Sequence, residues 1–279
     1  EPGDLNISLA LRFEDREGRI FTAHDLKVTA GAQGTWSIRV LNNEADIPAG
    51  GAFHFISLNY SFAHRIQVTD PARRDYATLE TDSRARLDLA AEVPGYYNLC
   101  RVYVTEGVFR RGEEFTLRLG DRRHGSVGAE VYWTTTQAAL VLGVDLAGDG
   151  TLAGIKGDPR RFEVVAENRP RFLRLLGPTA VEVGRDFDLL VGVHDRNGNP
   201  IPDYAGTVHL AGAPGVLGLP GECVFTPPHE GTQVLAKIRL DRPGVFRLAA
   251  RADGLDRECR SNPIVDRKSV VEGKTVDIG

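Results

Sequence analysis

The sequence predicts an all-β protein made of two antiparallel β-sandwich domains in tandem, the second of them immunoglobulin-like. Three observations predict this: apolar residues recur at every second position, the apolar runs are short, and glycine or proline separates them. A chain of 279 residues is too long for one small sandwich and long enough for two. We find no convincing amphipathic helix, since even 80–92 alternates with a period of two.

The alternation is clearest where Trp36, Ile38 and Val40 are interleaved with polar residues. Such a pattern places one row of side chains in a core and the other in solvent. The other runs with this period are 85–89, 100–104, 115–119, 131–133, 187–193, 234–240 and 246–250. We expect each run to form a strand, with Trp36 and Trp133 on its buried side.

Turn residues separate the runs at 48–51, 94–95, 148–150, 197–200 and 243–244. Glycine supplies a positive φ and proline fixes φ, so these positions suit hairpins and strand crossings. Asn168-Arg169-Pro170 interrupts the pattern after a strand at 162–165. We therefore predict one domain over 1–165 and an immunoglobulin-like domain over 166–265, whose length suits that fold.

Charge and cysteine content exclude several classes of protein. The formal net charge of -4 leaves no basic surplus for nucleic acid, and no apolar run approaches the ~18 residues that span a bilayer, so we expect neither partner. Cys100, Cys223 and Cys259 are too few for a disulfide framework or a zinc site. We expect free thiols, although Cys223 and Cys259 could pair. The absence of methionine indicates a processed form or a fragment, and the compartment stays open, with the cytoplasm slightly favoured.

Asp145 and Asp149-Gly150 contain part of a calcium loop but lack its alternating ligands and closing glutamate, so a hairpin turn is favoured. His194-Asp195, at a strand end, is predicted to be a structural pair. No spacing typical of a metal site occurs among the histidines, which are His24, His54, His64, His124, His194, His209 and His229.

Three further patterns invite a functional interpretation. Asp121-Arg122-Arg123-His124 is predicted to be a solvated charged loop rather than an anion site. A strand, not a helix, follows the evenly spaced Gly212, Gly215, Gly218 and Gly221, which disfavours a phosphate loop. A sugar-stacking platform of Trp36, Trp133, Tyr96 and Tyr97 is less favoured than core filling. The sequence therefore predicts no catalytic, cofactor-binding or metal-binding residue in this chain.

Several motifs resemble those of a known bacterial family. Asp195-Arg196-Asn197-Gly198-Asn199-Pro200 resembles the D-x-x-G-N-P turn of bacterial immunoglobulin-like repeats. The other motifs are Gly34-Thr35-Trp36, Ile47-Pro48-Ala49-Gly50-Gly51, Leu119-Gly120-Asp121-Arg122 and Ser261-Asn262-Pro263-Ile264. In this order they resemble the N-terminal region of a large family with a domain of unknown function. Its members carry two β domains ahead of a metal-dependent hydrolase domain of the PHP (polymerase and histidinol phosphatase) type.

The resemblance implies that the chain is a non-catalytic accessory region that positions or recognises substrate for its own C-terminal catalytic domain. The metal-ligand strand that opens this domain in the family does not follow Val265, so no metal ligand can be assigned here. Segment 266–279 instead resembles a translated sequencing adapter, as at the ends of metagenomic fragments, and we expect a non-native tail on a truncated chain. The alternative is a cell-surface adhesion or carbohydrate-binding module. Its ligand is unknown.

Overall fold

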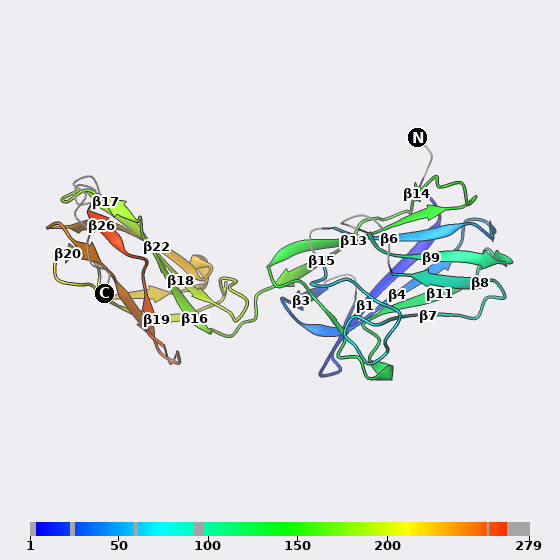
Figure 1. The fold of residues 1–279 in the computed structure, drawn as a ribbon, viewed down its shortest axis with the longest axis horizontal. Helices are drawn as coiled ribbons and strands as arrows, with labels where there is room; N and C mark the ends of the chain where they lie inside the picture. The colour runs from blue at the N-terminus through cyan, green and yellow to red at the C-terminus, as the bar shows by residue number, and fades with distance from the viewer. Residues whose placement is uncertain (1–3, 23–25, 59–60, 92–97, 256, 267–279) are drawn as a thin grey trace. The chain divides into compact units, whose positions relative to one another are not determined.

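The computed structural model describes residues 4–22, 26–58, 61–91, 98–255 and 257–266. It confirms the predicted fold class, since nearly every element is a strand and the strands form stacked sheets (Figure 1). The strand pairs are antiparallel except for β3 with β15 and β17 with β26, which are parallel. The chain divides into two compact units, Glu1–Val165 (unit 1) and Ala166–Gly279 (unit 2). This division coincides with the predicted one. None of the described helices has the length and apolarity needed to cross a membrane.

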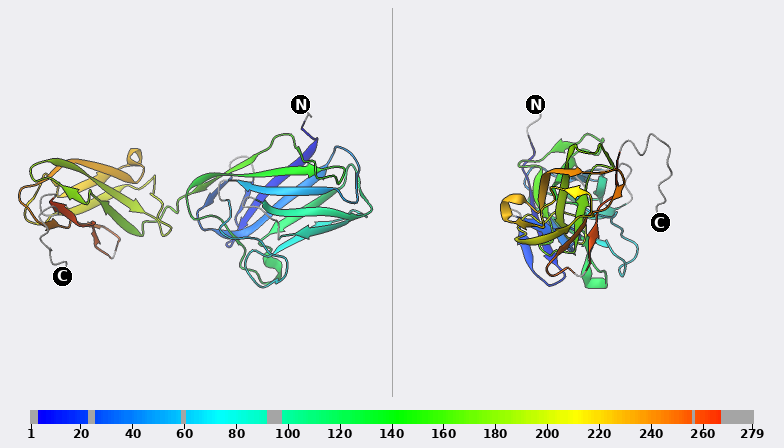
Figure 2. Two further views of the ribbon diagram at one scale, coloured as in Figure 1. Left: turned by 45° about the horizontal axis from the view of Figure 1, so that its top comes forward. Right: turned by 90° about the vertical axis from the view of Figure 1, so that its left-hand side faces the viewer.

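Unit 1 is a sandwich of two sheets (Figure 2). The first sheet has the strand order β2-β1-β4-β11-β7, and β12 also pairs with β4. Its strands are β1 Ile7–Asp15, β2 Ile20–Thr22, β4 Gln33–Asn42, β7 Ala77–Thr81, β11 Glu114–Leu119 and β12 Ala129–Glu130. A short 3-10 helix, η1 Arg122–His124, connects β11 to β12.

The second sheet of unit 1 has the order β3-β15-β13-β6-β9-β8, with β14 paired to β13. Its strands are β3 Lys27–Thr29, β6 Ala52–Leu58, β8 Arg86–Ala90, β9 Asn98–Glu106, β13 Thr136–Asp145, β14 Ala153–Gly154 and β15 Arg160–Val165. A separate two-stranded ribbon joins β5 Ile47–Pro48 to β10 Val108–Phe109.

Trp36 lies in the core of unit 1, as predicted. It is fully buried, and its ring centroid lies 4.7 Å from that of Phe13, 4.8 Å from Phe162 and 5.5 Å from Phe62. Phe13 and Trp36 come from paired strands of the first sheet, whereas Phe162 comes from β15 of the second. Aromatic packing between the two sheets therefore holds the sandwich together.

Unit 2 is the smaller sandwich. Its sheets have the orders β16-β18-β22-β20, β21-β19-β24-β25 and β17-β26-β23. The strands are β16 Phe172–Leu176, β17 Ala180–Val181, β18 Asp186–His194, β19 Gly206–Ala211, β20 Val216–Leu217, β21 Glu222–Phe225, β22 Thr232–Leu240, β23 Val245–Phe246, β24 Ala249–Ala252, β25 Cys259–Arg260 and β26 Ile264–Asp266. A 3-10 helix, η2 Pro227–His229, precedes β22.

Strand β26 corrects the predicted end of the second domain. Asp266, the first residue of the expected tail, is buried, pairs with Val181 in register, and donates its backbone N–H to the carbonyl of Gly244 at 3.2 Å. The second domain therefore includes at least Asp266, which the prediction assigned to the tail. The rest of the expected tail, 267–279, lies outside the described residues.

Three predicted strands differ in detail. The run 246–250 is divided between β23 and β24. The expected strand at 131–133 does not form. The strand β12 ends before it, at Glu130, and Val131 makes an isolated bridge with Phe62. In β22 the pairing register shifts opposite Phe187 and Leu189, at a bulge where Lys237 has a φ of 64°. A one-residue bulge reverses the alternation between its two sides, so Val234, before the bulge, is 60% exposed, whereas Ile238, after it, is buried as predicted.

The turn at 195–200 explains its own motif. Asp195 is fully buried, and its Oδ1 accepts the backbone N–H groups of Asn197 at 2.8 Å and Asn199 at 2.9 Å. His194 is also buried and contacts the Gly198 carbonyl through Nδ1 at 2.9 Å. Both residues hold the turn, which is the structural role predicted for them.

Three backbone segments of unit 1 cross so closely that only glycine fits. A Cβ on Gly120, where φ is +68°, would lie 1.9 Å from the backbone nitrogen of Ala129 and 2.7 Å from the Gly34 carbonyl oxygen. A Cβ on Gly128 would lie 2.7 Å from the Gly34 nitrogen. This "glycine crossing" of Gly34, Gly120 and Gly128 brings β4, the end of β11 and the start of β12 together.

Replacing Gly120 with alanine is expected to destabilise unit 1 by about 3 kcal/mol, because the new Cβ overlaps backbone atoms and φ is positive. Gly18→Ala is the matched control, with a φ of +80° and nothing within 4 Å of its Cβ, and should cost about 1 kcal/mol. Urea denaturation followed by tryptophan fluorescence measures both, since Trp36 and Trp133 both lie in unit 1. Equal losses would show that the crossing is not the tight constraint.

Unit 2 should lose stability as the pH falls from 7 to 5. Burial lowers the pKa of His194, and the Gly198 carbonyl only partly offsets this. Below the unfolded value of about 6.5, the unfolded chain therefore takes up a proton that folded His194 does not. Hydrogen exchange of β18 peptides in urea, corrected for intrinsic rates, should show that the free energy of unfolding falls as the pH falls. The slope of this free energy against pH should be smaller in His194→Phe. An unchanged slope in the variant would contradict the assignment.

A candidate binding pocket on unit 1

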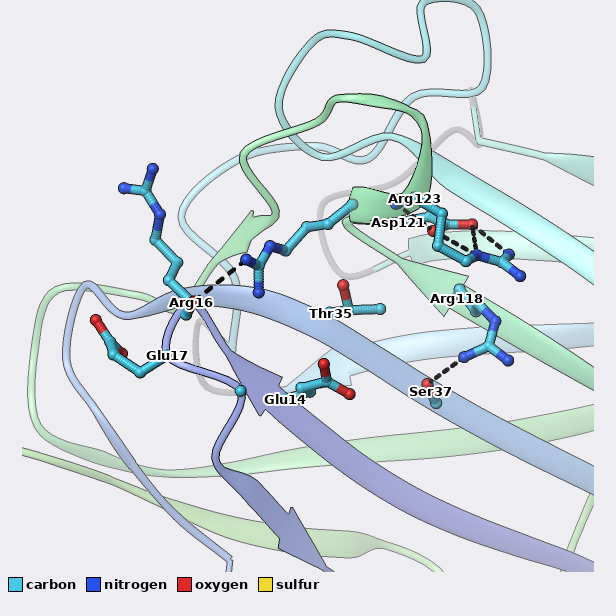
Figure 3. Close-up of a pocket in the computed structure, with 10 residues that line it drawn as sticks. Glu14, Arg16, Glu17, Thr35, Ser37, Arg118, Asp121 and Arg123 are labelled. Atoms are coloured by element: carbon cyan, nitrogen blue, oxygen red, sulfur yellow. Dashed lines mark hydrogen bonds and ion pairs between the residues drawn. The ribbon is translucent and has the colours of Figure 1, made fainter.

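A polar pocket of about 550 Å³ lies on the outward face of β1, β4 and β11, beside η1 (Figure 3). Strand alternation directs Thr35 and Ser37 outward from β4, while Trp36 between them fills the core. The pocket is lined by Glu14, Arg16, Glu17, Gly18, Thr35, Ser37, Arg118, Asp121, Arg122 and Arg123.

The strand register fixes the floor of the pocket. Glu14 lies opposite Thr35, and Arg118 lies opposite Ser37. Thr35 Oγ1 donates to the Gly120 carbonyl at 2.8 Å, and Arg118 donates to Ser37 Oγ at 3.0 Å. Figure 3 shows Thr35 and Ser37 between Arg16 on one side and Arg118 and Arg123 on the other. The floor therefore combines hydroxyl groups with a guanidinium.

Asp121 corrects the prediction of a solvated charged loop. Its side chain is only 1% exposed and caps η1 by accepting the Arg123 N–H at 3.1 Å. Thr78 Oγ1 donates to it at 2.6 Å, and Arg123 bridges it to Glu80. Burial opposes ionisation, but the hydrogen bonds from Arg123 and Thr78 outweigh it and hold the pKa of Asp121 well below its usual range.

The remaining charges of the pocket are not balanced in the same way. Glu14 pairs with Arg12 at 3.0 Å, so a partner outside the pocket neutralises it. Arg122 donates to two carbonyl oxygens, of Asp15 at 2.7 Å and of Arg16 at 3.3 Å. Arg16 donates to Gln33 Oε1 at 3.2 Å. Within the described part of the chain, neither Arg16 nor Arg122 forms an ion pair with a carboxylate, so both retain charge for a ligand.

The sequence analysis named Asp121, Arg122 and Arg123 but missed Thr35, Ser37 and Arg118. These three lie on the polar phase of strands whose apolar phase marked the core. Polar residues on the solvent face of a sheet are common, so the alternation alone gives no reason to single them out. Their convergence depends on which strands pair.

The other candidates have structural roles. The Asp145 carboxylate accepts backbone N–H groups from its own loop, including Gly148 at 2.7 Å and Gly150 at 2.8 Å, which confirms the hairpin turn. The strand β21 follows the spaced glycines, as predicted. In the described ranges, no three His, Cys, Asp or Glu side chains gather as metal ligands would. His24, Tyr96 and Tyr97 lie outside those ranges.

The three cysteines are free thiols, in agreement with the prediction. Cys223 in β21 and Cys259 in β25 lie on the two edge strands of one sheet. Burial raises the pKa of the Cys223 thiol to about 11 and also raises that of Cys100. These thiols are therefore protonated and unreactive near neutral pH.

Asp121→Asn is expected to destabilise unit 1 by about 2 kcal/mol at pH 7, because it leaves Arg123 without its buried partner. The half-exposed Arg123 keeps the loss below that of a fully buried pair. The lowered pKa of Asp121 means that its contribution is lost as the pH falls, so the acid sensitivity of unit 1 should also decrease. Glu80→Gln, at an exposed partner, is the control and should cost less than about 1 kcal/mol in urea denaturation. Equal losses would contradict the central role of Asp121.

No protein-family model matches the sequence, and no curated protein does. The fold is similar to solved bacterial β-sandwich structures. These include the D00-D0 domain of intimin (8% identity, TM-score 0.34, covering 93% of this chain and 99% of that one). A second similar structure is the C-terminal domain of the Streptococcus pyogenes antigen I/II-family protein AspA (10% identity, TM-score 0.37, covering 95% of this chain and 99% of that one). A third is the Escherichia coli adhesin FdeC (14% identity, TM-score 0.33, covering 95% of this chain and 65% of that one). Identities and TM-scores of this size do not establish a shared function.

Proposed function

We propose that the chain is a non-catalytic ligand-binding region of the adhesion or carbohydrate-binding type, in which the pocket of unit 1 holds an anionic group of the ligand. The observation that carries this is the unequal pairing of its charges. Asp121 is paired with Arg123, and Glu14 with Arg12, whereas Arg16 and Arg122 donate to neutral oxygens and form no ion pair with a carboxylate of the described residues. A carboxylate or sulfate placed there gains hydrogen bonds from charged donors.

The geometry of Arg122 supports this proposal. Two of its five N–H donors are fixed by the carbonyls of Asp15 and Arg16, which orients the guanidinium without neutralising it. Preorganised donors lose less entropy on binding than a freely rotating side chain. Thr35 and Ser37 on the floor add hydroxyl groups that suit a polyhydroxylated ligand.

Unit 2 would support this binding region. Its Asp195 Oδ2 accepts the backbone N–H of Glu167 at 3.0 Å, which fixes the segment next to unit 1 to the turn at 195–200. We propose that unit 2 is a spacer that carries unit 1. A secretion signal encoded upstream of these residues would support an extracellular adhesion role.

The accessory role in a PHP-type hydrolase is a second proposal. Its support is that two of the family-like motifs meet in space: Thr35 bonds to Gly120, and Trp36 pairs with Leu119 in register. The glycine crossing, rather than ligand binding, brings the two motifs into contact. A strand carrying metal ligands, encoded directly downstream of these residues, would favour this proposal over the first.

If the pocket binds an anionic group, the chain should bind a sulfated tetrasaccharide more tightly than the unsulfated form in isothermal titration calorimetry. Arg122→Gln should reduce this preference by about tenfold or more, because it removes a charged donor from the pocket. The affinity should also fall as salt is added.

Arg86→Gln is the control, since Arg86 lies in β8 and pairs with Glu106 at 3.1 Å. It should leave the preference unchanged. Equal affinity for both tetrasaccharides, or equal effects of the two substitutions, would contradict the proposal.

A further inference from the structure

We propose that Tyr132, Trp133 and His64 form an aromatic platform that binds the face of a neutral pyranose ring. The platform is separate from the charged pocket, whose lining includes none of these three residues. The alternation wrongly predicts that Trp133 is buried. Trp36 is fully buried, whereas Trp133 is 41% exposed.

The indole of Trp133 is exposed but not loose. It follows the end of β12, and its Nε1 donates to Glu130 Oε1 at 2.7 Å. Exposure of a large aromatic surface is unfavourable in water, and a hydrogen bond at one edge fixes the direction in which the rest of the ring is presented. The exposed part of the ring is therefore a defined surface.

Among the described residues, the rings of Tyr132 and His64 adjoin the indole. The Tyr132 ring is inclined by 27° to it, with centroids 5.6 Å apart. The His64 ring meets it edge-on at 75°, with centroids 5.8 Å apart. The half-buried Tyr132 and His64 thus brace Trp133 from neighbouring positions, and the three rings enclose a corner rather than a flat patch.

Glu130 connects the platform to the sandwich. Its side chain is 15% exposed, and its Oε2 lies 3.3 Å from His64 Nε2 and 3.5 Å from Arg74 Nη1. Arg74 Nη1 also lies 2.9 Å from His64 Nε2. Glu130 therefore accepts a hydrogen bond from the indole and lies close to Arg74, which in turn lies against His64 Nε2. Side chains that are already held in this way lose less entropy when a ligand binds.

The chemistry of this corner suits a sugar. A pyranose has an apolar C–H face that packs on an aromatic ring and a rim of hydroxyl groups that need hydrogen-bonding partners. Trp133 offers the aromatic surface, and Arg74, half-exposed at 54%, offers charged donors beside it. A purely apolar ligand would leave the guanidinium and the imidazole without new partners on binding.

Tryptophan fluorescence tests this directly. Cellohexaose, chitohexaose and mannohexaose are titrated onto the full chain, and at least one should shift the emission and protect it from acrylamide. The buried Trp36 should contribute little to either change. Trp133→Ala should weaken the binding of that sugar, measured by calorimetry, by about tenfold, and Trp133→Phe should retain most of the affinity.

Leu152→Ala is the matched control, because Leu152 of unit 1 is exposed to a similar extent, 43%. In Trp133→Ala, the emission of Trp36 reports whether unit 1 is folded. If that variant unfolds, Trp133→Phe and Trp133→Leu are compared instead, and the leucine variant should bind more weakly. No response to any of the three sugars, or unchanged affinity without the aromatic ring, would overturn the proposal.

Discussion

The close approach of three backbones at Gly34, Gly120 and Gly128 is the constraint on which the candidate site depends. Any side chain at Gly120 would meet the Ala129 backbone, so β11 could not turn directly into η1 beneath the start of β4. This crossing sets Thr35 against the Gly120 carbonyl and places Asp121 as the cap of η1. It also delivers the chain to β12, which ends at Glu130. The pocket and the aromatic platform therefore share one steric origin.

Local sequence patterns predicted the features whose partners are close in the chain. The sandwich class follows from alternation such as that around Trp36, and the turns at Asp145 and Asp195 follow from carboxylates that accept amides two to five residues later. The failures have equally local causes. Alternation does not reveal that β12 ends before Trp133, nor that a bulge at Lys237 reverses the phase of Val234.

The candidate site was beyond prediction for a different reason. Asp121 is buried against Thr78 and against Arg123, which also pairs with Glu80. Arg122 donates to backbone carbonyls that lie more than a hundred residues earlier in the chain. A run of charged residues is usually solvated, and only the pairing of β4 with β11 and of β11 with β7 changes that outcome here. The charge of segment 121–124 is visible in the sequence, but the partners that surround the segment are set by the order of the strands.

Gln33, at the start of β4, forms hydrogen bonds both to the pocket and to Glu130, which contacts the aromatic platform. Its Oε1 accepts from Arg16 at the pocket, and its Nε2 donates at 3.4 Å to Glu130, the carboxylate that holds Trp133. A single amide thus takes part in both hydrogen-bond networks. A ligand that drew Arg16 away from Gln33 would change the partners of Glu130, and the converse would hold with the same free energy. A ligand on one surface would in this way alter the hydrogen bonds of the other through Gln33.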